Sequence, residues 1–145
     1  MFEYIYQAFT VWFLGFFPFF EIYVAVPAGM ALGLDPVSVV VFAVAGNFKP
    51  VLLIEYGYYR LMKYQRVRRW LIRPVSEKFY RNINQYGIWY ILVITPWVGI
   101  WAVAVAARLL QMKRTLLIRG AFFSILVYAV GLVILITLGV DWFDR

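Results

Sequence analysis

The stretch PFFEIYVAVPAG, residues 18–29, decides how the first apolar part of this chain can fold. It places one carboxylate, Glu21, between Pro18 and Pro27 in otherwise apolar and aromatic sequence. Proline cannot donate a backbone hydrogen bond, and its ring clashes with the preceding turn, so it kinks or breaks a helix. A carboxylate inside a membrane is costly and marks a functional position by default. The stretch therefore predicts a break in a membrane helix, with an acidic group beside it.

The composition of the whole chain indicates an integral membrane protein. Of its 145 residues, 65% are hydrophobic and 14% are charged, whereas a soluble domain is about 45–50% apolar and about 25% charged. The length predicts a single membrane domain over residues 1–145. We read the net charge of +7 as contact with anionic membrane lipids and not with nucleic acid.

Enzyme activity is not expected from this sequence. It contains neither cysteine nor histidine, and it has no catalytic triad, Walker loop or metal-ligand cluster. We therefore expect no cofactor and no metal.

Two segments have the length of a transmembrane helix, which needs about 20 apolar residues. Residues 36–60 and 115–140 predict full spans. Residues 4–34 are too long for one span and too short for two, and ITPWVG interrupts residues 84–112 near the middle. These last two segments are either proline-kinked plain spans or re-entrant hairpins that enter and leave the membrane on one side.

The distribution of basic residues favours the hairpins. Four plain spans would place the basic segment 60–81 and the later basic group on opposite sides of the membrane, whereas two hairpins place both on one side. Because cytoplasmic loops carry an excess of lysine and arginine, we expect 60–81 in the cytoplasm and both termini outside. The membrane would be a prokaryotic-type inner or cytoplasmic membrane. The later basic group consists of Arg108, Lys113, Arg114 and Arg119.

Residues 62–83 predict a basic amphipathic helix on the membrane surface. Aromatic and aliphatic side chains recur among its charges at near-helical spacing, which is typical of a helix with its cations at lipid phosphates. Pro74 is expected to end or kink this helix. The alternative is a solvated cytoplasmic loop. The candidate headgroup contacts are Arg66, Arg68, Arg69 and, at the end of the second hairpin, Arg108.

The two halves of the chain, residues 1–61 and 84–145, have similar sequence patterns. Each reads as a hairpin followed by a span, and PFFEIYVAV at 18–26 aligns with PWVGIWAVA at 96–104. Because the halves start on opposite sides, we expect an all-α integral membrane protein built as an inverted repeat of two re-entrant hairpins and two full spans. The hairpin tips, expected to meet near the midplane, contain Pro18, Pro27, Pro96 and Gly99.

Three polar residues form the predicted transport site. Glu21 lies at the first tip, and Lys49 lies about 20 Å into its span at a rise of about 1.5 Å per residue. Pro50 cannot donate to the carbonyl of Gly46, which leaves this acceptor free beside Asn47. Because charges inside a membrane need partners, we expect Glu21 and Lys49 to pair, with Asn47 completing a polar pocket. A carboxylate removed from water binds a proton more readily, as a proton-coupled carrier requires.

Other residues near the tips have alternative roles. Tyr23, Trp97 and Trp101 are candidates for lining a path, because aromatic ring faces attract cations, although packing also explains each of them alone. Glu55 is expected to bind Arg60 or Arg108 structurally and not to take part in transport.

Three stretches share a pattern with a known family: FPFFEIYVAVPAGMALGL (17–34), AGNFKP (45–50) and TPWVGIWAVAVAARLL (95–110). With them the chain resembles the small multi-drug export protein family, a relative of the DedA/VTT superfamily of membrane proteins. The resemblance implies the re-entrant hairpins, and relatives are associated with ion- or proton-dependent export and with lipid movement between leaflets.

The chain departs from the family pattern at two places. Tyr23 stands where the family often has an arginine, and Ile94 and Gly99 stand where the DedA branch carries arginines around the second-tip proline. Any mechanism that needs an arginine at a tip is therefore in question here, and Lys49 is the intramembrane cation that would have to replace it.

These features predict a small membrane transporter coupled to protons or cations. One alternative is a translocase or scramblase for a phospholipid or a polyprenyl phosphate. The other, from a different class, is a non-transporting membrane subunit or assembly factor. The expected partners are membrane lipids and a small-molecule or lipid substrate. A homodimer is considered as well, since 145 residues offer little perimeter in which to enclose a path.

Overall fold

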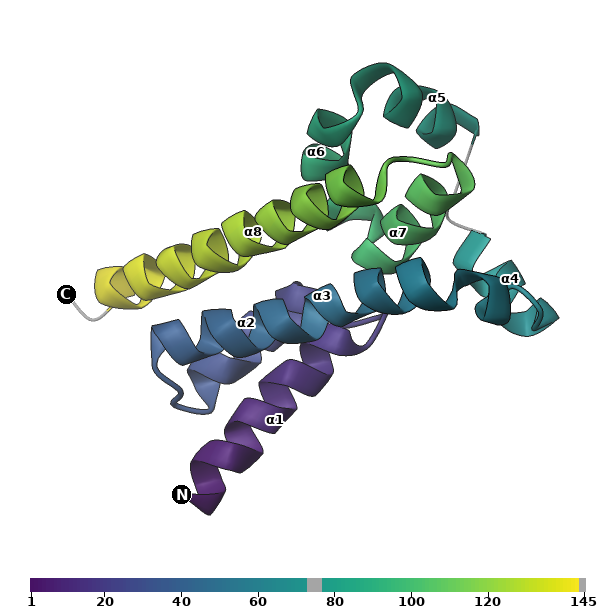
Figure 1. Cartoon of the computed structure of the whole chain (residues 1–145). Helices are drawn as coiled ribbons and strands as arrows, with labels where there is room; N and C mark the ends of the chain where they lie inside the picture. The colour runs from purple at the N-terminus through teal and green to yellow at the C-terminus, as the bar shows by residue number, and fades with distance from the viewer. Residues whose placement is uncertain (73–76, 144–145) are drawn as a thin grey trace. The chain divides into compact units, whose positions relative to one another are not determined.

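The computed structural model describes residues 1–72 and 77–143, and every element in these ranges is a helix. The chain divides into two compact units, Met1–Asn47 with Ile125–Arg145, and Phe48–Ser124. The expectation of an all-helical protein is therefore confirmed. The helices are α1 (Phe2–Phe16), α2 (Glu21–Ala31), α3 (Pro36–Leu61), α4 (Gln65–Ile72), α5 (Glu77–Tyr86), α6 (Ile88–Val98), α7 (Ile100–Leu109) and α8 (Arg114–Phe143) (Figure 1).

The two long helices, α3 and α8, are apolar enough to cross a membrane. α3 has 26 residues and α8 has 30, and the stretches suited to crossing are Pro36–Leu61 and Arg114–Gly139. At a rise of about 1.5 Å per residue, α3 is about 39 Å long, which exceeds a hydrocarbon core of about 30 Å. Both helices coincide closely with the predicted spans 36–60 and 115–140.

The start of α3 is encoded locally. The Asp35 carboxylate accepts a hydrogen bond from the N–H of Ser38 at 2.9 Å, as an N-cap residue does, and Pro36 follows at the first helical position. Hydrogen bonds from the Ser38 hydroxyl and, next in size, from its N–H hold the pKa of the exposed Asp35 below its usual range. The end of the first apolar segment and the start of the first span are thus separated by a defined cap.

In the first unit, α1 and α2 pack against each other as two arms joined by a turn (Figure 1). α1 ends at Phe16 and α2 begins at Glu21. Across the turn, the N–H of Glu21 donates to the carbonyl of Phe17 at 3.2 Å. Pro18 therefore lies at the break, as the sequence predicts.

Pro27 does not lie at the break, which corrects the sequence-based expectation. It lies inside α2, where its ring removes the hydrogen bond to the carbonyl of Tyr23. Tertiary packing keeps this segment helical, because Gly29 fits tightly between Val11 of α1 and Val39 of α3. A Cβ atom at Gly29 would lie 2.8 Å and 2.9 Å from their methyl groups.

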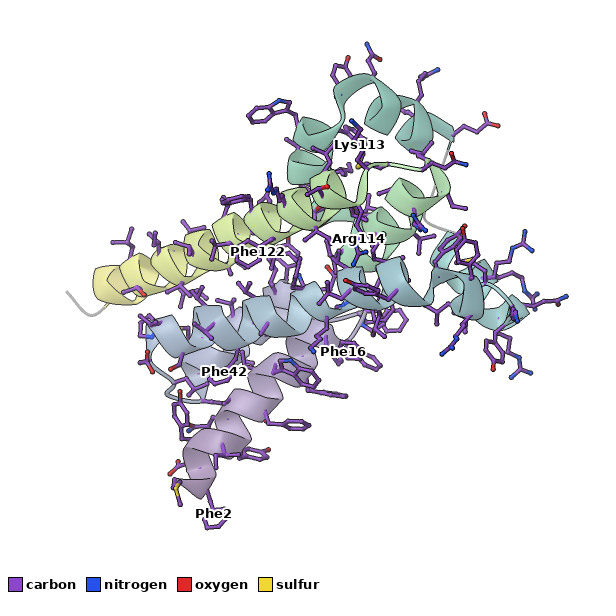
Figure 2. All side chains as sticks on the ribbon, in the orientation of Figure 1. Phe2, Phe16, Phe42, Lys113, Arg114 and Phe122 are labelled. Atoms are coloured by element: carbon purple, nitrogen blue, oxygen red, sulfur yellow. The ribbon has the colours of Figure 1, made fainter. Side chains whose placement is uncertain are left out.

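Two glycines allow α1 and α3 to cross closely. A Cβ atom at Gly46 would lie 2.1 Å from the carbonyl oxygen of Trp12, and one at Gly15 would lie 2.8 Å from the carbonyl oxygen of Ala43. The same position at Gly46 is 3.1 Å from the backbone nitrogen of Phe16, which Figure 2 labels at the end of α1. Small residues permit such backbone contact in membrane helices, so this crossing depends on glycine.

In the second unit, α6 and α7 form another pair of short helices that pack against each other. A single residue, Gly99, separates them with φ 89 and ψ 149, a conformation that is strained for residues other than glycine. Pro96 lies in the last turn of α6, just before this break. Ile91 from α6 and Val103 from α7 meet in a buried cluster. The second predicted break is therefore present at Gly99.

Within the predicted surface helix 62–83, the described residues form two helices, α4 and α5, which lie before and after residues 73–76. α4 packs on α7, and α5 packs on α6. Both are strongly amphipathic, and Val67 of α4 packs against a core cluster containing Ile54. Pro74, expected to end or kink the helix, lies outside the described residues.

Candidate functional site

Glu21 occupies a strained and buried position at the first break. It begins α2, its exposed fraction is 6%, and its φ is +50. For a residue other than glycine, this left-handed backbone costs about 1–2 kcal/mol. Such strain persists only where the surrounding structure enforces it, and it concentrates at functional sites. The α1–α2 turn thus holds the carboxylate away from water in a conformation that the sequence alone would not favour.

Asn47 is the second unusual polar residue in the first unit. Its exposed fraction is 1%, and neither Oδ1 nor Nδ2 has a hydrogen-bond partner among the residues that the structure describes. Leaving a buried polar group unsatisfied costs about 1–3 kcal/mol. Such groups are rare in folded proteins and call for an explanation, such as a catalytic or ligand-binding role. The Asn47 amide is therefore a candidate for binding a small polar ligand.

Glu21 and Asn47 both lie close in the chain to the crossing of α1 and α3. Asn47 follows Gly46, which is in close contact with Trp12 and Phe16 at the end of α1. The turn that leads to Glu21 begins directly after Phe16. The end of α1 therefore brings the turn before Glu21 and the buried amide of Asn47 to the same part of the first unit.

Lys49 lies on a different part of α3. It belongs to the second unit, and its side chain is exposed. The predicted Glu21–Lys49 pair joins residues of different units, so it stays a prediction. A lysine in the middle of a membrane span needs a partner or a polar path.

The predicted path-lining aromatic residues differ in burial. Trp97 is 83% exposed and Tyr23 is 36% exposed. Trp101 is partly buried and packs against the cluster that contains Ile54. Trp101 thus contributes to the packing of the second unit, whereas Tyr23 and Trp97 are accessible.

Sequence reasoning missed Thr95, which is 4% exposed and directly precedes Pro96. Its hydroxyl donates to the carbonyl of Ile91 at 2.6 Å. A hydroxyl next to a proline in an apolar segment is the signal that could have identified it.

A cluster of two arginines and one glutamate lies in the second unit. Glu55 Oε1 is 3.8 Å from a terminal nitrogen of Arg108 and 3.9 Å from Nε of Arg114, and the Glu55 side chain is 6% exposed. Arg114 also donates to the hydroxyl of Tyr56, and its guanidinium lies 4.3 Å from the centre of the Tyr56 ring. Of the two partners expected for Glu55, Arg60 and Arg108, the structure shows Arg108 in contact with it. Arg114 was not foreseen as a partner, although it belongs to the later basic group of the sequence.

The remaining predicted headgroup contacts lie on α4. Arg66, Arg68 and Arg69 are all exposed, and they occupy one short amphipathic helix. This arrangement leaves their guanidinium groups accessible to an anionic surface.

Residues 21–136 match a family model described as "Putative small multi-drug export protein". The chain belongs to this family. The matched region begins at Glu21, ends within α8 and includes Asn47, Lys49 and the Glu55 cluster. The family description names export and not a chemical reaction, and together with the two long apolar helices it indicates a membrane protein. No curated protein and no solved structure matches this small multi-drug export protein.

Proposed function

We propose that this small multi-drug export protein is a transporter coupled to proton or cation movement, with Glu21 as the coupling residue. The observation that carries the proposal is the burial of the Glu21 carboxylate in left-handed backbone at a helix break. Carboxylates at such positions bind and release protons when their surroundings change. Broken helices are also where many transporters place their ion and substrate sites.

Asn47 and the Gly46 carbonyl would complete the site. Pro50 has no N–H for the carbonyl of Gly46, and the Asn47 amide is buried without a partner among the described residues. A carboxylate, an amide oxygen and a carbonyl oxygen are the donors that small hard cations prefer. Lys49 would then neutralise Glu21 in the state without a bound proton or cation.

The α1–α2 and α6–α7 pairs would act as the two re-entrant hairpins of an inverted repeat. The four helices have 15, 11, 11 and 10 residues, and at about 1.5 Å per residue they are about 15–22 Å long, shorter than a hydrocarbon core of about 30 Å.

The two hairpins also end in the same way, which supports a repeat. After α2, the N–H of Leu34 donates to the carbonyl of Gly29 at 3.1 Å, and after α7 the N–H of Met112 donates to the carbonyl of Ala107 at 2.9 Å. Both are the six-to-one bonds of a Schellman motif, with Gly33 and Gln111 in the left-handed position.

The proposal is tested in proteoliposomes that contain a lipophilic cationic dye and carry an imposed pH gradient. Glu21→Gln removes the titrating group with little change of volume and is expected to abolish gradient-driven dye movement, whereas Glu21→Asp retains part of it. Glu3→Gln, which neutralises an exposed glutamate in the first turn of α1, serves as the matched control. Wild-type dye movement in Glu21→Gln would refute the coupling role.

The Glu21–Lys49 pair is tested separately by exchanging the charges. Glu21→Lys and Lys49→Glu are each expected to be inactive, and the double variant is expected to regain dye movement because it restores the ion pair. Two single defects that the double variant fails to rescue would remove Lys49 from the site.

Lipid translocation is a second candidate, favoured by the exposed arginines of α4. In this case labelled phospholipid would exchange between the leaflets of reconstituted vesicles, and Lys49→Ala would abolish the exchange. A non-transporting subunit would instead tolerate Glu21→Gln, but it would lose membrane or partner association when Arg66, Arg68 and Arg69 are neutralised together.

A further inference from the structure

We infer that Arg108 and Arg114 form a binding site for a phosphate group, and that Glu55 serves as their internal counter-ion while the site is empty. The site lies wholly within the second unit. The site involves none of the residues assigned to proton or cation coupling, so the inference can be tested independently of that function.

The charges of the cluster are unbalanced. Two guanidinium groups face one carboxylate, and both contacts are long, at 3.8 Å and 3.9 Å. Close charge-assisted hydrogen bonds between arginine and an oxyanion are about 2.7–2.9 Å long. Glu55 therefore neutralises part of the positive charge without engaging the planar fork of either arginine. A second anion would balance the remaining charge and use these donors.

Aromatic rings hold the two guanidinium groups in place. The Arg114 group lies 4.3 Å from the centre of the Tyr56 ring, and the Arg108 group lies 5.9 Å from the centre of the Tyr59 ring. These contacts are cation–π interactions, and Tyr56 also accepts a hydrogen bond from Arg114. Because the arginines are already ordered, binding an anion costs less side-chain entropy.

The chain path delivers both arginines to Glu55 from one short connection. Arg108 lies in the last turn of α7 and Arg114 begins α8. Between them Gln111 adopts a left-handed φ of 53, which turns the chain back. Figure 2 labels Lys113 and Arg114 at the start of α8. Lys113, which directly precedes Arg114 in the chain, is also exposed.

Phosphate fits this set of donors better than a carboxylate does. The arginine fork matches the oxygen spacing of phosphate, and a phosphate monoester carries about 1.5 to 2 negative charges at neutral pH, enough to balance the excess. The Arg108 and Arg114 side chains are 28% and 49% exposed, so an anion can reach them. Both a lipid headgroup and a soluble phosphate supply this chemistry, and the experiment distinguishes them.

The test uses the full chain in nanodiscs of neutral phosphatidylcholine. One arm titrates inorganic phosphate by calorimetry, and the other measures binding of phosphatidic acid incorporated in the nanodisc by native mass spectrometry. We expect Arg108→Gln and Arg114→Gln each to weaken binding about tenfold or more, as loss of a charge-assisted contact does. Arg119→Gln removes the same charge from an exposed position of α8 and is expected to change affinity less than about twofold.

Glu55→Gln distinguishes a phosphate site from a cluster whose arginines only pair with Glu55. If Glu55 competes with the ligand, its neutralisation is expected to tighten phosphate binding about two- to fivefold, the range set by weak ion pairs. If Glu55→Gln does not fold, Arg114→Lys replaces it, since this variant keeps the charge but loses the fork, and it is expected to weaken binding. Phosphate binding without phosphatidic acid binding assigns a soluble ligand, and the reverse assigns a lipid.

The inference is overturned if the wild type binds neither probe. It is also overturned if Arg108→Gln and Arg114→Gln bind as tightly as Arg119→Gln. Glu21→Gln is expected to retain full phosphate binding, so a failed transport assay and a failed phosphate assay are distinguishable.

Discussion

The crossing of α1 and α3 at Gly46 makes the sharpest prediction for stability. In Gly46→Ala, the new methyl group would lie 2.1 Å from the carbonyl oxygen of Trp12, 2.9 Å from its carbonyl carbon and 3.1 Å from the nitrogen of Phe16. All three are backbone atoms, so no rotamer change relieves the contact. Close contacts between carbon and oxygen are about 3.3–3.6 Å long, and the end of α1 must therefore move by about 1 Å.

The expected loss of stability follows from two opposing contributions. Overpacking of this kind costs up to about 3 kcal/mol, while replacing glycine by alanine inside a helix stabilises it by about 1 kcal/mol. The net loss is about 2 kcal/mol, equivalent to a fall of about 4–8 °C in Tm for a chain of this size. Because α1 leads into the turn before Glu21, we expect dye transport to fall as well.

Thermal unfolding in detergent, followed by tryptophan fluorescence, measures this effect. Gly131→Ala is the matched control, because it makes the same substitution in α8 where a Cβ atom meets nothing within 4 Å. The control is expected to be as stable as the wild type or up to about 1 kcal/mol more stable. If Gly46→Ala shifts Tm in the same direction as Gly131→Ala, the close crossing of α1 and α3 does not exist.

Three further predictions use four single-residue variants. Gln111→Gly is expected to raise the free energy of unfolding by about 1 kcal/mol, because it removes left-handed strain. Gly33→Ala is expected to lower it, because Gly33 has φ +84 although the space around it is open. Tm values equal to that of the wild type would contradict both expectations. Because the pKa of Asp35 is lowered in the folded protein, its carboxylate contributes fully to stability above the pKa that Asp35 has in the unfolded chain. This contribution to stability is lost as the pH falls through the lower pKa of the folded state. An acid titration of Tm is therefore expected to be shallower in Asp35→Asn, and an unchanged slope would exclude the cap. Asn47→Leu is expected to stabilise the ligand-free protein by about 1–2 kcal/mol and to abolish transport; a fall in Tm would mean that the amide is hydrogen-bonded in the folded state.

The sequence predicted the long helices well because their signals are local. Pro36 and the capping residue Asp35 start α3, and the apolar length that follows exceeds what a span needs. The breaks near Pro18 and at Gly99 also follow from local chemistry, since proline removes a donor and glycine tolerates positive φ. The membrane topology of the hairpins rests on charge and length, and it stays a prediction.

Where the sequence misled, long-range packing decided the result. Pro27 reads as a break, but contact of Gly29 with Val11 and Val39 keeps α2 helical around it. In α2 a tertiary contact outweighed a local preference.

The candidate sites show the same division. Sequence alone marks Glu21, Asn47 and Lys49, because polar groups are conspicuous in apolar segments, and it offers Arg60 and Arg108 as partners for Glu55. It could not show that Asn47 is buried without a hydrogen-bond partner among the described residues, that Glu21 has positive φ, or that Arg114 shares the Glu55 carboxylate. Residue type and order set which charges must find partners inside a membrane. Which partners they find depends on backbone contacts between distant segments, such as Gly46 with Trp12, and these exist only once the chain has folded.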